Sequence, residues 1–370
     1  MRRDGHRASI PVGPVGKHLA TVRNLEGRLD SEFDNPTTKS RSQALKAMTI
    51  RDDDDNSLVW QDVVRPEPDV GEVLIDVKAT SCNRADLLQR RGMYHPPEGA
   101  SEIIGLDAAG IVEEVADGVE DVEPGDRVCA LLAGGGYAEY TTCPAALVMP
   151  VPDHLSLAEA AAIPEVFFTA FLNIFLEADH EPGDSVLVHA AASGVGTAAV
   201  QLCKAFDSPV YGTASQSKLD FLDQLGIDAA IDRNNDDFSA RLDQLTDRRG
   251  VDIVLDPVGG NYFQKNLHLL ATGGRLVVIG LLGGSDSEIS LGRLLMKRLR
   301  VIGSVLRSRS LDEKSTIADE FRSTVWPLFF DGTLQPIIDR RMSIEEANEA
   351  HELLEENATI GKIVLTIGDS

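Results

Sequence analysis

The stretch Ser185-Val-Leu-Val-His-Ala-Ala-Ala-Ser-Gly-Val-Gly196 decides the fold of this chain. It predicts an apolar β-strand, then a tight turn that contains glycine, then a helix that continues over Thr197–Ala205. Such a turn presents unpaired backbone N–H groups at the start of a helix, where the helix dipole also favours an anion. The stretch therefore predicts a phosphate-binding turn of the kind found in dinucleotide sites.

The turn is followed by alternating strands and helices, which is the setting that dinucleotide binding requires. We expect strands at 186–189, 210–213, 229–231, 252–255, 275–279 and 301–304. Helices are expected between them, for example at 217–225 and 262–270. This pattern predicts a parallel, doubly wound α/β sheet. By itself the turn also fits an ordinary strand-to-helix connection, because Ala191 and Ser193 replace two of the usual glycines.

The N-terminal half predicts a second, β-rich domain. Strands are expected at 45–50, 58–64, 72–80, 110–115, 126–132 and 137–142, with one helix at 85–91. After residue 306 we expect helices at 311–330 and 343–356 and a final strand at Lys362–Ile367. That strand has no place in the wound sheet, so we expect it to return to the N-terminal domain.

Composition narrows the functional class. The 370 residues predict two domains, and 43% hydrophobic residues suffice for ordinary cores. The net charge of −24 disfavours nucleic acid and anionic membrane surfaces as partners. No uninterrupted apolar run reaches 18 residues, so no membrane-spanning helix is expected. The four cysteines form no Cys-x-x-Cys pair, which favours a reducing, cytoplasmic location.

Residues 1–44 differ from the rest in being basic and in lacking hydrophobic periodicity. We interpret them as a disordered extension. A targeting peptide fits less well, because Asp and Glu are too frequent. A third interpretation is that the start of the chain has been placed too far upstream, and that the codon read as Leu45 is the true initiator.

The second wound strand suggests which cofactor is used. Sites for NAD usually place an acidic residue about 20 residues after the glycine turn, where it holds the ribose 2′-hydroxyl. Here the strand ends Tyr211-Gly-Thr-Ala-Ser215 without an acid. Ser215, Lys218 and Arg233 could instead bind a 2′-phosphate, which predicts NADPH. A solvated surface lysine is the alternative for Lys218.

The carboxyl ends of wound strands are where a ligand should lie. Three of these ends form turns and supply further cofactor candidates. The turn Asp256–Gly260 supplies Val258, and the turn Ser304–Ser308 supplies Arg307. The turn Gly280–Gly284 supplies three candidates, namely Gly280, Leu281 and Leu282.

Several motifs occur in a familiar order: Asn83-Arg-Ala-Asp-Leu-Leu-Gln-Arg-Arg-Gly-Met-Tyr94, Gly105-Leu-Asp-Ala-Ala-Gly110, Pro164-Glu-Val-Phe-Phe-Thr-Ala170, the glycine turn, Leu306-Arg-Ser-Arg309 and Ile360-Gly-Lys-Ile-Val364. Over about 45–367 the chain resembles the zinc-free quinone oxidoreductase branch of the medium-chain dehydrogenase/reductase superfamily. It is most similar to the tumour-suppressor-inducible quinone oxidoreductase-like group.

The resemblance implies a GroES-like substrate domain, 45–168 and 306–370, and a Rossmann domain, 169–305. It implies a homodimer or homotetramer that reduces quinones or activated alkenes with NADPH. Thr169 would pack near the nicotinamide, Ser193, Gly194, Val195 and Gly196 would hold the pyrophosphate, and Thr359 would lie near the nicotinamide end. Zinc-dependent relatives carry Gly-His-Glu where this chain has Gly105-Leu-Asp107, so we expect a metal-free enzyme with Cys82 as a buried packing residue.

Hydride transfer to a quinone needs no nucleophile or metal from the protein. Asn83 and Tyr94 flank the first predicted helix and are the candidates to hydrogen-bond the substrate oxygen. Structural roles are the alternatives: a helix N-cap for Asn83 and a surface aromatic for Tyr94. An enone reductase, with Tyr94 as proton donor, and a non-catalytic NADPH-binding protein remain the rival functions.

Overall fold

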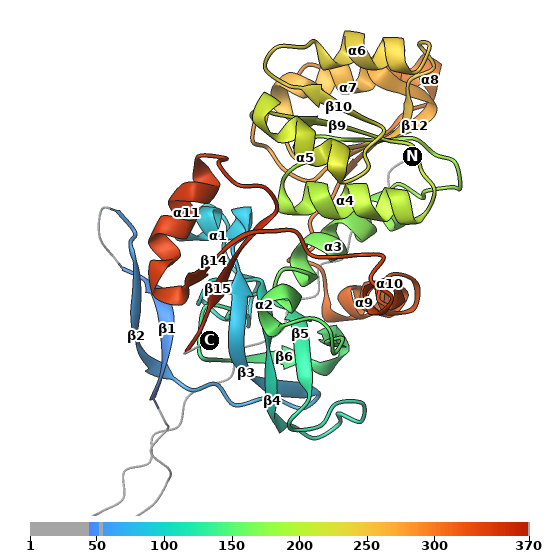
Figure 1. Ribbon diagram of the computed structural model, residues 1–370. Helices are drawn as coiled ribbons and strands as arrows, with labels where there is room; N and C mark the ends of the chain where they lie inside the picture. The colour runs from blue at the N-terminus through green and yellow to red at the C-terminus, as the bar shows by residue number, and fades with distance from the viewer. Residues whose placement is uncertain (1–43, 52–54, 369–370) are drawn as a thin grey trace, which may run out of the picture. The chain divides into compact units, whose positions relative to one another are not determined.

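The computed structural model describes residues 44–51 and 55–368, and its strands β8 to β13 form one parallel sheet (Figure 1). The sheet has the strand order β10-β9-β8-β11-β12-β13, which is the order of a Rossmann sheet and confirms the predicted fold class. Its strands are β8 (Val186–Val188), β9 (Val210–Ala214), β10 (Ala229–Asp232), β11 (Val251–Asp256), β12 (Leu270–Val278) and β13 (Arg300–Gly303).

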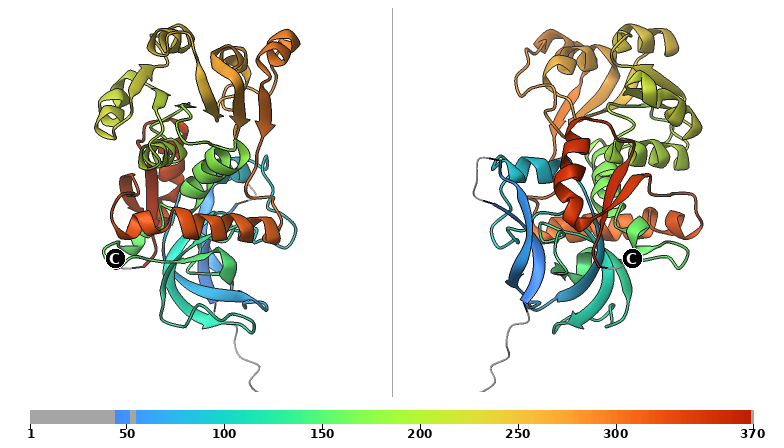
Figure 2. Two further views of the ribbon diagram at one scale, coloured as in Figure 1. Left: turned by 90° about the vertical axis from the view of Figure 1, so that its right-hand side faces the viewer. Right: turned by 60° about the vertical axis from the view of Figure 1, so that its left-hand side comes forward.

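Helices cover both faces of this sheet (Figure 2). Val186, Val188 and Leu255 belong to a buried cluster that includes residues of α4, whereas Leu187 and Val254 belong to a second cluster with α6 and α7. The alternation follows from the two-residue period of a strand and explains the short, continuous apolar runs. The connecting helices are α4 (Gly194–Ala205), η3 (Gln216–Lys218), α5 (Leu219–Gln224), α6 (Phe238–Leu245), η4 (Gly260–Tyr262), α7 (Phe263–Leu269) and α8 (Leu291–Lys297).

A second sheet has the order β14-β15-β3-β4-β5-β7, with β6 also paired to β3. The final strand β15 pairs antiparallel with β3, with Leu365 opposite Thr80, so its predicted return to the N-terminal part is confirmed. Strands β1 and β2 form a separate antiparallel ribbon. The strands are β1 (Ala44–Ile50), β2 (Leu58–Val64), β3 (Glu72–Ser81), β4 (Asp107–Val115), β5 (Arg127–Leu131), β6 (Tyr140–Pro144), β7 (Val148–Pro150), β14 (Ile338–Ser343) and β15 (Lys362–Thr366).

The helix α3 connects the two sheets in sequence and packs through aromatic side chains. Phe168 stacks on Phe321 of α9 with ring centroids 4.2 Å apart, and Phe167 meets Phe329 of α10 edge-on. The border that we expected at residue 168 falls inside this helix. The helices here are α1 (Arg84–Arg90), η1 (Ala145–Leu147), α2 (Leu157–Ala160), α3 (Pro164–Phe171), the π-helical η2 (Leu172–Glu177), α9 (Leu311–Thr324), α10 (Pro327–Phe330), η5 (Ile344–Glu346) and α11 (Ala347–Glu355).

The segment Leu157–Glu177 is long and apolar enough to cross a membrane by length and composition alone. Within the described residues, however, 72% of its most apolar window is buried in the protein. Burial of this extent is typical of a core helix. The aromatic contacts of Phe167 and Phe168 are therefore sufficient to explain why the segment is apolar.

The structure differs from the expected element positions in several places. The strand predicted at 137–142 lies at Tyr140–Pro144, because the backbone of Tyr137 bonds Met48 and Ile104 instead. The helix predicted over 311–330 breaks before Pro327, which lacks the N–H that a continuing helix needs. Strand β14 was not predicted, since its sequence Ile338-Asp-Arg-Arg-Met-Ser343 is mostly polar. The proposed disordered extension lies outside the described residues except for Ala44, which begins β1.

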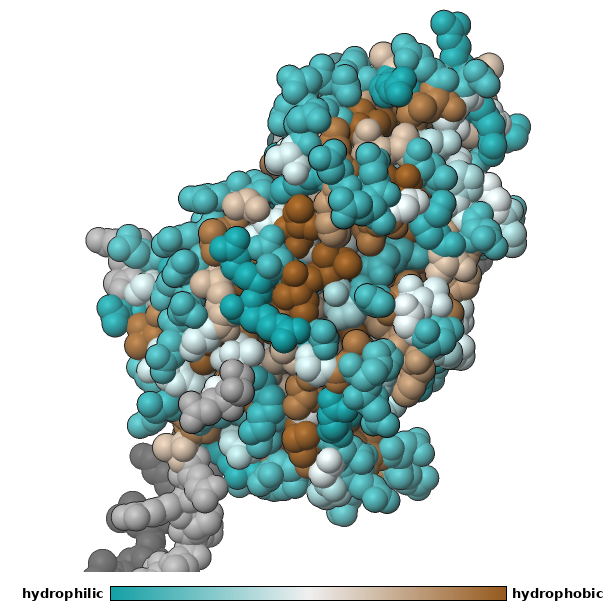
Figure 3. Space-filling view, in the orientation of Figure 1, coloured by the Kyte–Doolittle hydropathy of each residue, from teal (hydrophilic) through white to brown (hydrophobic). Residues whose placement is uncertain are grey.

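Most of the face seen in Figure 3 is hydrophilic, and apolar residues gather in its middle. A hydrophilic surface is what the net charge of −24 leads one to expect.

Candidate functional site

The turn that we expect to bind phosphate lies between β8 and α4. Ser193 caps the helix by accepting a hydrogen bond from Gly196 N–H at 3.1 Å. Among the described residues no acceptor is found for the N–H of Val195 in the first turn of α4, whereas Gly194 adjoins the bridge between Ser193 and Gly361. A Cβ on Gly196 would lie 2.4 Å from Ala190 O, so the close turn needs a glycine there. The arrangement fits a dinucleotide pyrophosphate.

The same turn lies directly against two other parts of the chain. Gly361, just before β15, donates its N–H to Ala192 O at 2.9 Å. A Cβ on Gly194 would lie 2.7 Å from Lys362 Cδ and 2.9 Å from Val166 Cγ1 of α3. The glycine therefore allows the turn, the start of β15 and α3 to meet.

The three candidates for the 2′-phosphate are close together at the ends of β9 and β10. Lys218 N–H bonds Ser215 O at 2.9 Å, and Arg233 N–H bonds Ala214 O at 2.8 Å. The Lys218 ammonium also donates to the carbonyl oxygens of Asn357 and Thr359, each at 2.7 Å. Thr359 thus reaches this end of the site through its backbone.

The loops after β11 and β12 pack on each other beside the turn. Gly283 N–H bonds Val258 O at 2.7 Å, and Leu282 N–H bonds Pro257 O. A Cβ on Gly280 would lie 2.8 Å from Pro257 O, which explains the glycine. Leu281 and Leu282 are 56% and 58% exposed, so these loops present apolar surface at the carboxyl edge of the sheet.

A buried ammonium group organises the other side of the site. Lys362 is 3% exposed, and its Nζ donates to Asn83 Oδ1 at 2.5 Å and to Cys82 O at 2.9 Å. Its third neighbour is Asp107 Oδ2 at 3.3 Å. Asn83 Nδ2 in turn donates to Asp107 Oδ2 at 2.7 Å and to Ser81 O at 3.3 Å. The amide of Asn83 is therefore already engaged, which favours a positioning role over direct contact with a substrate.

Sequence reasoning missed Glu165, which the structure places in this region. Glu165 and Thr169 are the two residues of α3 that are only partly buried, and since they are four positions apart they share one helical face. Glu165 donates its backbone N–H to Asp107 Oδ1 at 2.7 Å, but its carboxyl makes no hydrogen bond with any described residue. It is the one charged residue between 164 and 176, and that isolation in an apolar helix was the signal available in the sequence.

The environment of Glu165 favours the neutral acid. Burial raises the pKa of this carboxyl to about 8, and the nearby carboxylate of Asp107 adds to the shift. Lys362 acts in the opposite direction but does not cancel it. A neutral carboxylic acid can donate a proton at pH 7.

Tyr94 and Arg307, predicted from distant motifs, are in contact. The Arg307 guanidinium carbon lies 5.2 Å from the centre of the Tyr94 ring, which is a cation–π distance. Arg307 is 4% exposed and donates to Ala133 O at 2.8 Å and Gln89 Oε1 at 2.7 Å. A further bond from Arg307 Nη1 to Tyr94 O, at 3.5 Å, joins Arg307 to the loop of Tyr94, so Arg307 fits a positioning role better than direct cofactor contact. Burial raises the pKa of Tyr94, and Glu165 contributes to the shift.

The cysteine that resembles a zinc ligand does not fit one here. Cys82 is 2% exposed, and its Sγ lies 3.2 Å from the hydroxyl of Tyr137, which donates to it. Burial raises the pKa of this thiol to about 12, whereas a zinc ligand must be a thiolate. Within the described ranges, no group of three or more His, Cys, Asp and Glu side chains could hold a metal ion.

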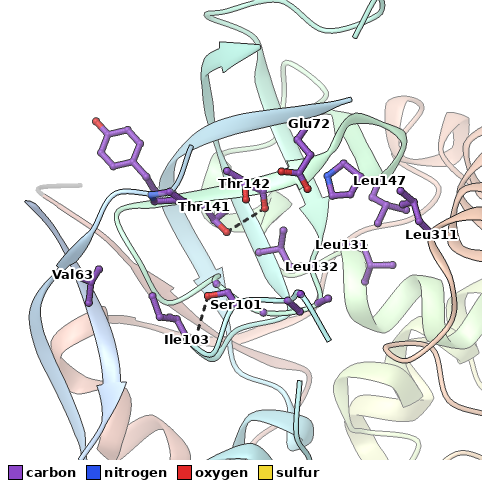
Figure 4. Close-up of a pocket in the computed structure, with 18 of the residues that line it drawn as sticks. Val63, Glu72, Ser101, Ile103, Leu131, Leu132, Thr141, Thr142, Leu147 and Leu311 are labelled. Atoms are coloured by element: carbon purple, nitrogen blue, oxygen red, sulfur yellow. Dashed lines mark hydrogen bonds between the residues drawn. The ribbon is translucent and has the colours of Figure 1, made fainter. Parts of the chain in front are cut away.

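A cavity of about 310 Å³ lies in the β-rich part of the chain and reaches Ala133, the residue that accepts a hydrogen bond from Arg307. Ile103, Leu131 and Leu132 are among its apolar lining residues (Figure 4). Its polar groups are partly engaged with each other: Ser101 Oγ accepts the N–H of Ile103 at 3.2 Å. None of the predicted site residues lines this cavity.

Comparisons with known proteins agree with the fold. Residues 69–153 match the alcohol dehydrogenase GroES-like domain, and residues 194–323 match the zinc-binding dehydrogenase family. The chain belongs to the medium-chain dehydrogenase/reductase superfamily. It is 33% identical over 320 residues to the synaptic vesicle membrane protein VAT-1 homolog of Rattus norvegicus, covering 82% of this chain and 79% of the relative.

Two further relatives indicate the range of activities in this group. The chain is 31% identical over 309 residues to a quinone oxidoreductase of Rattus norvegicus, covering 83% of this chain and 92% of the relative. The crystal structure of CurK enoyl reductase matches with a TM-score of 0.78 and 27% identity, over 88% of this chain and 100% of that one. These relatives support an oxidoreductase that acts on a small molecule with a nicotinamide cofactor, and they fit the predicted quinone oxidoreductase-like group.

The turn generates a direct prediction. Gly196→Ala should weaken binding of a nicotinamide cofactor, tested with NADPH, at least about tenfold, roughly 1.4 kcal/mol, because the new Cβ would meet two backbone oxygens at 2.4 and 2.5 Å. Fluorescence titration with NADPH measures the effect. Gly292→Ala is the matched control, since a Cβ there meets nothing within 4 Å. Equal NADPH affinity in the two variants would contradict the assignment of this turn.

Proposed function

We propose that this protein is an NADPH-dependent, zinc-independent quinone oxidoreductase. One observation carries the proposal: α3 approaches the phosphate-binding turn through Val166, and its two partly buried residues, Glu165 and Thr169, lie on one face of the same helix. Cofactor-binding and proton-donating groups thus belong to one site. The similarity to a quinone oxidoreductase over 92% of that protein supports quinone as the substrate class.

The cofactor roles follow from the geometry at the edge of the sheet. The turn Ser193–Gly196, with the N–H of Val195, would hold the pyrophosphate, and Ser215 with its cationic neighbours would hold the 2′-phosphate. Thr169 and the loop with Val258 would flank the nicotinamide end. When bound, NADPH supplies the hydride.

The protein must also supply a proton. Hydride transfer to one carbonyl oxygen of a quinone leaves the other oxygen as an anion, and a proton on that oxygen completes the hydroquinone. We assign this proton to the Glu165 carboxyl, which is neutral at pH 7 because burial raises its pKa to about 8. The carboxylate that remains would be reprotonated from solvent. The pKa of Tyr94 is raised above its ordinary value of 10, so its hydroxyl is the weaker acid.

Reduction of an activated alkene is the second candidate, and the match to an enoyl reductase favours it. The same hydride would add to carbon, and the same carboxyl would protonate the product. A protein that binds NADPH without oxidising it is the third possibility.

Turnover measured by the loss of NADPH absorbance distinguishes these functions. We expect oxidation with ortho- or para-quinones and a preference for NADPH over NADH, because no acid stands at the end of β9. Turnover with enones alone would favour the alkene reductase. Binding of NADPH without oxidation by either class would overturn an enzymatic role.

Changing the proposed acid should alter the pH profile. A carboxyl with a pKa of about 8 is protonated below that pH, so kcat should fall as the pH rises through 8. Glu165→Gln should lower kcat about 10²-fold and remove this fall, while NADPH affinity stays within about twofold. Glu120→Gln, at an exposed loop position, is the control and should behave as the wild type. A fall near pH 8 that persists in Glu165→Gln would exclude Glu165 as the donor.

We also propose that the protein forms a homodimer through β13. This strand is at the end of the sheet order, so among the described strands one of its edges is unpaired. Nearby, Leu295 and Met296 of α8 are 75% and 79% exposed, and Val301 of β13 is 40% exposed. An apolar patch beside an open edge suits a second copy of the same surface.

Light scattering after size-exclusion chromatography measures this association. The wild type should have at least twice the mass of one chain, and Leu295→Glu with Met296→Glu should shift it toward one chain. Val70→Glu, at a 79% exposed apolar residue on another part of the chain, is the control. An unchanged mass in the double variant would show that this surface is not the interface.

A further inference from the structure

Arg84, at the start of α1, is joined to the proposed phosphate-binding lysine through one residue. Its Nη2 donates to Asn357 Oδ1 at 2.5 Å, and the backbone oxygen of the same Asn357 accepts from Lys218 Nζ at 2.7 Å. Asn357 lies between α11 and β15 with a φ of +57°. An arginine next to Asn83 and a lysine after β9 therefore converge on a single residue.

Arg233 is the third cation of this group. Its backbone bonds Ala214, so it lies beside the turn that carries Lys218. The pKa of Lys218 is lowered first by burial and then by repulsion from Arg233 and Arg84. The pKa of Arg84 is lowered by burial and by repulsion from Arg91 and Arg233. The three positive charges are thus close enough to destabilise one another.

These cations have no carboxylate partner of their own. Across residues 44–51 and 55–368, no ion pair within 4.0 Å involves Arg84, Lys218 or Arg233, although the chain carries a net charge of −24. Asp339 is near enough to raise the pKa of Lys218, but its oxygens bond Ile360 N–H and Arg340. By contrast, Arg91 pairs with Glu355. Like charges held together without an anion indicate an anion-binding site.

We infer that Arg84 is a third cation for the 2′-phosphate of the cofactor, supplied from the part of the chain that carries Asn83 and Tyr94. The inference rests on the proposed use of NADPH and extends it. Arg84 has four N–H donors beyond the one given to Asn357, and Lys218 has one beyond its two carbonyls. These free donors can bind phosphate without breaking the existing contacts.

The assignment has a consequence for specificity. A 2′-phosphate would neutralise repulsion among three cations, whereas the 2′-hydroxyl of NADH would leave it in place. Part of the preference for NADPH should therefore come from Arg84, which lies outside the Rossmann sheet. That contribution is separate from catalysis, so it can be measured without a substrate.

Isothermal titration calorimetry with adenosine 2′,5′-bisphosphate and adenosine 5′-phosphate tests the inference on the full chain. The wild type should bind the bisphosphate more tightly. Arg84→Gln should weaken bisphosphate binding about tenfold and leave the affinity for the monophosphate within about twofold. Arg84→Lys keeps the charge and is least disruptive to folding, so its affinity for the bisphosphate should lie between those of the wild type and Arg84→Gln.

Arg91→Gln is the matched control, because this neighbouring arginine already has Glu355 as a partner. It should leave both affinities close to the wild type. If the wild type does not distinguish the two nucleotides, the proposed NADPH preference fails. If the wild type distinguishes them and Arg84→Gln does so equally well, the role of Arg84 alone is overturned.

Discussion

The buried ammonium of Lys362 is the interaction on which the site depends. A charge in the interior is costly unless oxygen ligands surround it, and here Asn83, Cys82 and Asp107 supply them. Removing one partner of such a buried pair typically costs about 3–5 kcal/mol. Because Lys362 begins β15, its bonds fix the last strand of the chain to the start of α1 and to β4.

The aliphatic part of the Lys362 side chain connects this network to the phosphate-binding turn. Gly194 lies so close to Lys362 Cδ that a methyl group would not fit. The network also sets the charge near Glu165: Asp107 raises its pKa, and Lys362 opposes the rise. One buried cation therefore positions the phosphate-binding turn and limits how far the pKa of the neighbouring carboxyl rises. This explains why the C-terminal segment must return across the chain before the site is complete.

The sequence predicted the elements that have strong local signals. The wound sheet followed from short apolar runs and turns, and the return of β15 followed from its lack of a place in that sheet. Predictions failed where long-range contacts decide. The strand expected to begin at Tyr137 begins at Tyr140, because the backbone of Tyr137 bonds Met48 and Ile104. Strand β14 is mostly polar and therefore lacks the alternation of apolar and polar residues that predicts a strand.

The site shows the same limit. Ser215, Lys218 and Arg233 were predicted because each follows a strand that can be read locally. The engagement of Asn83 with Lys362 joins residues 279 positions apart, and no local pattern reveals it. Glu165 had a local signal, a single charge in an apolar helix, but its role required knowing that Asp107 lies beside it.

A crystal structure of the full chain with NADPH would test the account most directly. We expect the pyrophosphate on the backbone of Gly194, the 2′-phosphate at Ser215 and Lys218, and the nicotinamide on the side of α3 that carries Glu165 and Thr169. A dinucleotide bound in another place, or a nicotinamide turned away from Glu165, would contradict the proposal that one site holds both the cofactor and the proton donor.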